Sequence, residues 1–256
     1  MRTDLAAYRA THSEQERIAD LFALLPLSGR LALDIGARDG YLANLLAERF
    51  DKVVALDLAK PDIDHPKIEP VQGDATCLQF SANHFDVVLC AEVLEHLPDN
   101  ILAKACSEIA RVAGNYVVIG VPYRQDLRCG RTTCQCCGAV NPPWGHVNCF
   151  DEARLRALFP SLTWERSTFV GSNLERTNFV SAALLDFAGN PFGTWQQDEP
   201  CVHCGQSIGS AKARSLEQRL ATRTAFILNR LQASFLKPQA NWIHVLFSKH
   251  SAKLNA

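Results

Sequence analysis

Residues 30–50, RLALDIGARDGYLANLLAERF, predict a buried strand, a glycine-containing turn and an amphipathic helix. Residues 31–35 are mostly apolar, as in a buried strand, and the leucines within 42–46 supply the buried face of the helix. Gly36 and Gly40 allow the turn to bend tightly and its backbone to approach a ligand. The stretch therefore predicts a nucleotide-binding α/β unit.

The spacing of the turn indicates which kind of nucleotide fits. A dinucleotide fingerprint requires G-x-G-x-x-G after the strand, whereas this chain has Asp34-x-Gly36-x-x-x-Gly40. A carboxylate at the end of the first strand repels a pyrophosphate. It can instead hold the ammonium of a methionyl group, directly or through water.

This segment resembles the first motif of class I S-adenosylmethionine-dependent methyltransferases. Four further stretches follow in the order that the resemblance requires: VVALDLA (53–59), VQGDATCLQF (71–80), FDVVLCAEVLEHL (85–97) and NYVVIGVPY (115–123). The resemblance implies that Asp57 binds both ribose hydroxyls and that Asp74 recognises the adenine amino group. Arg38 departs from the family pattern, which often has a glycine in the middle of the turn.

The resemblance covers about residues 13–170 and the final strand. It implies an α/β fold with a Rossmann-like, seven-stranded, mostly parallel sheet whose last strand is antiparallel. We expect one methyltransferase domain over residues 1–256, with insertions at 124–149 and 171–239. The resemblance also implies a set of S-adenosylmethionine contacts: Asp34, Gly36, Gly40, Asp57, Leu58, Asp74, Ala75, Cys90 and Glu92.

Alternation of apolar strands and amphipathic helices supports a parallel sheet. We expect an opening helix over 13–26, with Ser13 as its N-cap. The remaining expected elements are strands at 53–56, 70–71, 85–90, 116–121, 162–170 and 241–250, and helices after Pro98, over 150–160 and over 210–235. The turn-rich stretch 129–149 is expected to contain no regular element.

Composition narrows the choice of partners and compartment. The 256 residues are 47% hydrophobic and 21% charged, and the formal net charge is -1. This charge disfavours nucleic acid as a partner, because non-specific nucleic-acid binding depends on a basic field. No signal sequence or membrane-spanning stretch is visible, so we expect a cytoplasmic protein. Cysteines in that reducing compartment suggest metal binding rather than disulfides.

Two C-x-x-C motifs, Cys134–Cys137 and Cys201–Cys204, are each followed by glycine. This pattern is typical of a Cys₄ zinc site. Both motifs follow strands that leave the same end of a parallel sheet, so a zinc ion would join two loops into a lid. The alternative is a redox-active or merely buried set of cysteines. Substitute ligands are available at Cys129, Cys136, Cys149 and His203, whereas Cys77, Cys90 and Cys106 fit the core.

Methyl transfer is an in-line displacement that depends on orientation, and a hydroxyl acceptor also requires a base. His146 lies between the zinc loop and the next predicted helix and is the first candidate base; the alternative is a histidine that orders its loop. His96, after the fourth strand, is the second candidate, and its alternative is packing at a helix start. Tyr123 is a weaker candidate, and Glu92 is expected to line the cofactor.

The predicted helix over 210–235 has an apolar stripe with basic residues beside it. Leu216, Leu220, Ile227 and Leu231 form the stripe. Residues 210–237 could rest on a membrane surface or hold an acidic substrate. We favour a cover helix whose stripe packs on its own domain.

The sequence thus predicts an S-adenosylmethionine-dependent methyltransferase with a structural zinc. We expect O-methylation of a small-molecule, glycan or lipid-linked acceptor. The alternatives are an RNA methyltransferase and a non-catalytic module that binds the cofactor or uses its zinc site for protein interactions.

Overall fold

The computed structural model describes residues 5–249, which form two compact units. The sheet unit comprises Gln15–Tyr123, Phe150–Val170 and the chain from Trp242 onward. The cysteine unit comprises the chain up to Glu14, Arg124–Cys149 and Gly171–Asn241. The ranges predicted as insertions, 124–149 and 171–239, lie in the cysteine unit. The expected single methyltransferase domain over 1–256 stays a prediction.

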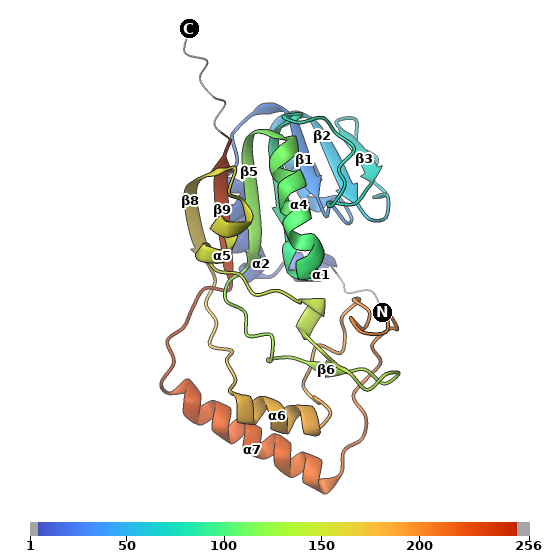
Figure 1. The fold of residues 1–256 in the computed structure, drawn as a ribbon, viewed down its shortest axis with the longest axis vertical. Coiled ribbons are helices and arrows are strands. Elements are labelled where there is room, and N and C mark those ends of the chain that lie inside the picture. The colour runs from blue at the N-terminus through green and yellow to red at the C-terminus, as the bar shows by residue number, and fades with distance from the viewer. Residues whose placement is uncertain (1–4, 250–256) are drawn as a thin grey trace. The chain divides into compact units, whose positions relative to one another are not determined.

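A seven-stranded sheet with the order β3-β2-β1-β4-β5-β9-β8 forms the centre of the sheet unit (Figure 1). Its strands are β1 (Gly29–Ile35), β2 (Phe50–Asp57), β3 (Ile68–Gln72), β4 (Phe85–Ala91), β5 (Ala113–Pro122), β8 (Thr163–Val170) and β9 (Trp242–Ser248). Neighbouring strands are parallel except at β9, which is antiparallel to both β5 and β8. The predicted Rossmann-like sheet with an antiparallel last strand is confirmed.

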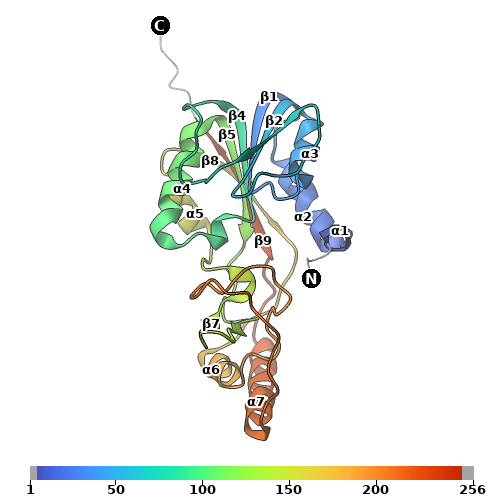
Figure 2. The same ribbon diagram turned by 90° about the vertical axis from the view of Figure 1, so that its right-hand side faces the viewer.

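Helices cover both faces of this sheet (Figure 2). One face carries α2 (His12–Ala23) and α3 (Tyr41–Ala47), and the other carries α4 (Asp99–Val112) and α5 (Glu152–Leu158). Successive residues of β4 divide between the two faces, because side chains alternate along a strand. Val88 packs in one hydrophobic cluster, and Val87 and Leu89 pack in the other. A central strand covered on both sides must be nearly all apolar, as β4 is.

The first long helix begins earlier than its expected start. Helix α2 starts at His12, and the Thr11 hydroxyl accepts a hydrogen bond from the Glu14 backbone N–H at 3.4 Å. The prediction of Ser13 as the N-cap is therefore wrong, since Ser13 lies inside the helix. Thr and Ser both cap helices through the same geometry, and Thr11 lies only two residues before Ser13.

The cysteine unit is built from short elements and two longer helices. Its elements are α1 (Leu5–Arg9), β6 (Thr132–Thr133), β7 (Val140–Asn141), the 3₁₀ helix η2 (Pro143–Gly145), α6 (Phe179–Phe187) and α7 (Leu216–Ala233). The expectation of no regular element in 129–149 is wrong, because β6 and β7 pair as an antiparallel hairpin. Within the described residues, no helix is long and apolar enough to cross a membrane.

Capping side chains set the first residues of α6 and α7. The Asn178 side chain accepts a hydrogen bond from the Ser181 N–H at the start of α6. At the start of α7, Ser215 and Gln218 form a reciprocal capping box. This cap places the start of α7 at Leu216 rather than near residue 210. Helix α6 was absent from the sequence prediction.

Candidate functional site

The candidate cofactor site lies where β1, β2, β3 and β4 end along one edge of the sheet. In the parallel register, Asp34 of β1 lies opposite Ala55 of β2 and Leu89 of β4, and Asp57 lies opposite Gln72 at the end of β3. The carboxyl ends of parallel strands meet at one edge, where open α/β sheets bind their ligands. The acids predicted from separate motifs therefore gather at the same edge.

The turn after β1 passes close to its neighbours and needs glycine at both ends. Gly36 and Gly40 both have φ of 80°, in the left-handed region. A Cβ added at Gly36 would lie 2.3 Å from Val93 Cγ2, and one at Gly40 would lie 2.4 Å from Ile63 Cδ1. The Gly36 N–H donates to the Leu56 carbonyl at 2.8 Å, which fixes the turn against the end of β2.

Asp57 links the turn to the second strand. Its carboxylate accepts hydrogen bonds from the backbone N–H of Arg38 at 2.8 Å and of Leu58 at 2.7 Å. Arg38 itself has φ of 50°, so this non-glycine residue adopts the conformation that glycine favours in the family motif. The Leu58 side chain is 71% exposed at this edge. An exposed leucine beside an anchored carboxylate can cover a flat ring whose sugar the carboxylate binds.

Asp34 has an unusual environment for a carboxylate. The residue is 1% exposed, and within the described chain its Oδ2 atom has no hydrogen-bond partner. Burial and, to a smaller extent, the Asp57 charge raise its pKa to about 7, against the opposing effect of a hydrogen bond from the Ala43 backbone. A buried acid without a counter-charge is costly unless a cation pairs with it. The side chain thus fits the ammonium or sulfonium of S-adenosylmethionine.

The remaining predicted contacts lie after β3 and β4. Asp74 is exposed, and its carboxylate accepts a hydrogen bond from the Thr76 N–H at 2.8 Å, while Ala75 beside it is buried. Cys90 is fully buried within β4, and burial raises the pKa of its thiol well above the usual value. The cofactor roles of Asp74, Ala75 and Cys90 stay predictions.

Two glutamates follow β4, and sequence reasoning singled out only the first. Glu92 has φ of 57°, and its Oε2 accepts a hydrogen bond from Trp242 Nε1 at 3.3 Å. Glu95 is fully buried, and neither of its carboxylate oxygens has a hydrogen-bond partner among the described residues. Burial, followed by the Glu92 charge, raises the pKa of Glu95 well above its usual value. The repeated acid in an otherwise apolar stretch was the signal available for Glu95.

The two candidate bases belong to different units. His96 closes the 3₁₀ helix η1 (Leu94–His96) in the sheet unit. His146 follows η2 in the cysteine unit, where it is buried and its Nδ1 lies 2.6 Å from Gln125 Oε1. The Gln125 contact orders the imidazole ring within its loop. The catalytic roles of both histidines stay predictions.

Four thiols converge in the cysteine unit. The Sγ atoms of Cys134 and Cys204 lie 3.7 Å apart, as do those of Cys137 and Cys201, and all four lie within 4.8 Å of one another. A tetrahedral zinc ion with Zn–S bonds of about 2.3 Å requires S···S separations of about 3.8 Å. The cluster matches the four cysteines predicted as ligands, and its geometry fits the metal.

The backbone of each C-x-x-C motif supports this cluster. Gly138 and Gly205 have φ of 75° and 70°, which closes each turn beneath its thiols. Backbone N–H groups of residues 136 and 137 donate to the Cys134 sulfur, and those of residues 203 and 204 donate to the Cys201 sulfur. Such donors stabilise thiolate, the form that binds a metal. Cys129, Cys136, Cys149 and His203, predicted as substitute ligands, lie outside the cluster found among the described residues.

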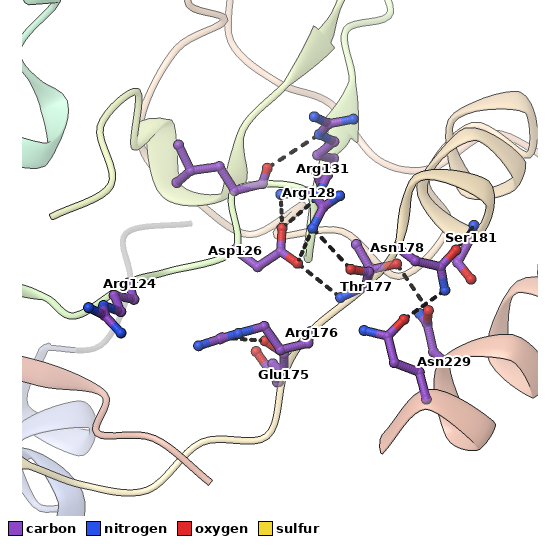
Figure 3. A network of polar contacts seen from close by, with 12 residues as sticks. Arg124, Asp126, Arg128, Arg131, Glu175, Arg176, Thr177, Asn178, Ser181 and Asn229 are labelled. Carbon is purple, nitrogen blue, oxygen red and sulfur yellow. Dashed lines mark hydrogen bonds and ion pairs between the residues drawn. The ribbon is translucent and has the colours of Figure 1, made fainter. Parts of the chain in front are cut away.

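A polar network joins the loop after β5 to the two long helices of the cysteine unit (Figure 3). The Asp126 carboxylate accepts hydrogen bonds from the Arg128 side chain at 2.8 and 3.0 Å and from the Thr177 N–H at 2.9 Å. Although burial opposes it, this pairing holds the pKa of Asp126 below its usual value. The Thr177 hydroxyl then donates to Asn229 Oδ1 of α7 at 3.0 Å.

A cavity of about 930 Å³ lies within the cysteine unit beside this network. Aromatic rings and guanidinium groups both line it, including those of Trp144, Trp195, Phe192, Arg176 and Arg230. Trp144 has φ of 57° and is held by its N–H, which donates to Gln197 Oε1 at 2.8 Å. The lining of this cavity thus combines aromatic and basic side chains with the carboxylate of Glu175.

Comparisons with known proteins relate the sheet unit to methyltransferases. Residues 33–116 match the family described as methyltransferase domain. A putative methyltransferase from Bacillus halodurans has a similar fold, with a TM-score of 0.58 and 16% identity over 91% of this chain and 99% of that one. An N-methyltransferase from Bradyrhizobium japonicum, NodS, solved with S-adenosyl-L-homocysteine, gives a TM-score of 0.56 with 16% identity over 98% and 94%. Residues 33–116 therefore match a methyltransferase domain, and the chain shares the fold of these solved methyltransferases.

Particular relatives are found among ubiquinone biosynthesis O-methyltransferases. That of Paracidovorax citrulli is 29% identical over 110 residues, which are 38% of this chain and 46% of the relative. That of Idiomarina loihiensis is 31% identical over 99 residues, which are 34% of this chain and 41% of the relative. The chain thus spans less than half the length of the curated relatives it matches.

Proposed function

We propose that this protein transfers a methyl group from S-adenosylmethionine to a hydroxyl of a small-molecule acceptor. The observation that carries the proposal is the buried carboxylate of Asp34, whose Oδ2 has no hydrogen-bond partner within the described chain, beside the tight turn at Gly36; this arrangement suits a cationic methionyl group. The names of the relatives, O-methyltransferases of ubiquinone biosynthesis, support oxygen as the accepting atom.

The cofactor supplies an activated methyl group on a sulfonium, and the chain supplies its position. Asp34 would pair with the positive charge. The Asp57 carboxylate already accepts hydrogen bonds from the N–H groups of Arg38 and Leu58, and its remaining lone pairs would accept hydrogen bonds from the ribose hydroxyls. Asp74 would recognise the adenine amino group. Orientation of reactants can supply most of the rate enhancement of an in-line displacement.

Removal of the acceptor proton requires a base. His146 Nδ1 faces the carbonyl oxygen of the Gln125 side chain, an acceptor, so the imidazole donates there and carries its lone pair on Nε2. That tautomer suits a general base, and we propose His146 for this role with His96 as the second candidate. The glycan or lipid-linked acceptors expected from the sequence remain within the same proposal.

We also propose that Cys134, Cys137, Cys201 and Cys204 bind one structural zinc ion. The S···S separations of 3.7 Å and the supporting backbone N–H groups favour it. The ion would join the 134–137 turn to the 201–204 turn within the cysteine unit. A closed set of four thiolates leaves no open coordination position for catalysis.

Calorimetric titration with S-adenosylmethionine tests the cofactor assignment. Asp57→Ala is expected to remove measurable binding, and Asp51→Ala is the matched control because Asp51 is an exposed acid at the other end of the same strand. Equal affinities of the two variants would contradict the site. Methyl transfer from labelled cofactor to hydroxylated aromatic compounds and sugars then tests the acceptor class, and labelling of thiols or amines alone would refute O-methylation.

A further inference from the structure

Helix α7 turns its apolar stripe away from its own unit. Its buried residues are Ala221, Thr222 and Ala225. At 100° per residue these lie opposite the stripe of leucines and isoleucine. The four stripe residues are 55–77% exposed: Leu216, Leu220, Ile227 and Leu231. The prediction that the stripe packs on its own domain is therefore wrong.

Helix α6 has the same inverted arrangement. Its buried residues are Ser181 and Ala182, whereas Phe179, Val180 and Phe187 are 55–81% exposed. The two helices run side by side (Figures 1 and 2). Small and polar residues thus face the helix partner, and large apolar residues face outward.

Polar contacts hold the two helices antiparallel. At one end, Asn178 Nδ2 donates to Gln232 Oε1 at 2.8 Å, and at the other Gln218 Nε2 donates to the Phe187 carbonyl at 3.1 Å. A pair of helices exposed only to water would normally place its polar groups outside and its apolar groups between the helices. Large apolar patches left on a surface mark interaction sites.

The charge around α7 identifies the kind of surface that fits. Residues 210–237 contain six basic residues and one acidic residue, a net charge of +5 in a chain whose net charge is -1. Helical periodicity places Arg219, Arg223 and Arg230 along one edge of the apolar stripe. An apolar stripe edged by guanidinium groups complements an anionic lipid surface, which offers acyl chains below a layer of phosphates.

We propose that the paired helices α6 and α7 dock on the surface of an anionic lipid bilayer. The apolar faces enter the boundary between headgroups and acyl chains, and the arginines bind lipid phosphates. The helices lie on the membrane, because neither is long and apolar enough to cross it. A second copy of this chain fits this face less well, because two α7 segments brought together would place two net charges of +5 against each other, and these would repel. This proposal does not depend on the transferase activity.

Vesicle flotation of the full chain tests the proposal. We expect binding to phosphatidylcholine vesicles that contain about 30% phosphatidylglycerol, and little binding to phosphatidylcholine alone. Replacing Arg219 and Arg223 together by Gln should weaken binding about 25-fold, because each basic residue near the surface contributes about fivefold. The matched control replaces Lys52 and Lys104, exposed lysines of the sheet unit, by Gln, and should change binding less than about twofold.

The apolar contribution is tested separately with neutral substitutions. Leu220→Ser with Ile227→Ser should weaken binding at least about tenfold, whereas Leu27→Ser, at an 85% exposed position of the sheet unit, should leave it unchanged. All of these side chains are exposed, so circular dichroism should report the same fold for each variant. Equal binding to neutral and anionic vesicles, or to neither, would overturn the proposal. So would light scattering that shows a dimer lost in the Leu220 and Ile227 double variant, because the face would then serve a second copy.

Discussion

Replacing Asp34 by Asn should stabilise the protein while it abolishes cofactor binding. Burial raises the pKa of Asp34 from 3.8 to about 7, so the folded protein resists ionisation that the unfolded chain accepts. A difference of this size corresponds to about 4 kcal/mol of free energy of unfolding. The amide of Asn has nearly the same shape as the carboxyl and carries no charge.

The sign of the effect follows from linkage. Because the folded pKa is raised, the wild-type protein has its full stability below pH 3.8 and loses it as the pH rises through about 7. The Asn variant lacks this loss. The difference in free energy of unfolding between variant and wild type should therefore grow by about 1.4 kcal/mol per pH unit across that window.

Urea unfolding between pH 5 and pH 8 measures this difference directly. We expect the variant to gain about 2 to 3 kcal/mol relative to wild type from the lower to the upper end. Asp51→Asn, at an exposed position of β2, is the control and should give a flat difference. A flat difference for the Asp34 variant as well would refute the raised pKa of Asp34 in the folded, cofactor-free protein.

Cofactor affinity should depend on pH in the opposite sense to stability, because it should rise as Asp34 ionises. A bound cation favours ionised Asp34, so we expect the affinity of the wild-type protein for S-adenosylmethionine to fall up to about tenfold per pH unit below pH 7. Calorimetry on wild type should show this slope. Tight binding by the Asn variant would mean that the cationic part of the cofactor lies elsewhere.

Three further substitutions test the turn, the metal cluster and the base. Gly36→Ala should lower the free energy of unfolding by about 2 to 4 kcal/mol and weaken cofactor binding, because Ala is strained at a φ of 80° and its Cβ meets Val93. Denaturant unfolding measures this change, and a variant as stable as wild type would contradict the geometry. Cys134→Ser should remove zinc detected by elemental analysis, whereas Cys136→Ser, outside the cluster, should retain it; zinc lost equally from both would disprove the ligand set. His146→Ala should lower kcat about 100-fold or more with unchanged cofactor affinity, and a normal kcat would leave it an architectural residue.

The sequence predicted the structure best at positions where packing against several neighbours restricts which residue types fit. Strands β1, β2 and β4 must be apolar because helices cover both faces, and the acids at their ends interrupt that pattern visibly. Asp34 and Asp57 could therefore be placed at one sheet edge from the chain alone, and the family resemblance added Asp74 after the third strand. Glu95 was missed because its burial comes from tertiary packing, which the alternation of residue types does not record.

In the cysteine unit, the periodicity of apolar residues predicted neither the existence of α6 nor the orientation of α7. Helix α6 has apolar residues around most of its circumference, so no contrast of faces marks it as a helix. In α7 the stripe gave the correct element but the wrong orientation, because small residues such as Ala221 and Ala225 form the helix contact. Four cysteines, by contrast, were predictable, since the ion that would join them requires a fixed local spacing whatever lies between the pairs.

The position of β9 between β5 and β8 affects the order in which the chain can fold. Strand β8 has no partner in the sheet until the ribosome has added the 71 residues of Gly171–Asn241 and then β9 itself. At a synthesis rate of about 5 to 20 residues per second, that interval lasts about 4 to 16 seconds. During it the edges of β5 and β8 are unpaired and open to pairing with other chains. Lengthening the 171–241 segment would extend this exposure without changing a single contact of the finished sheet.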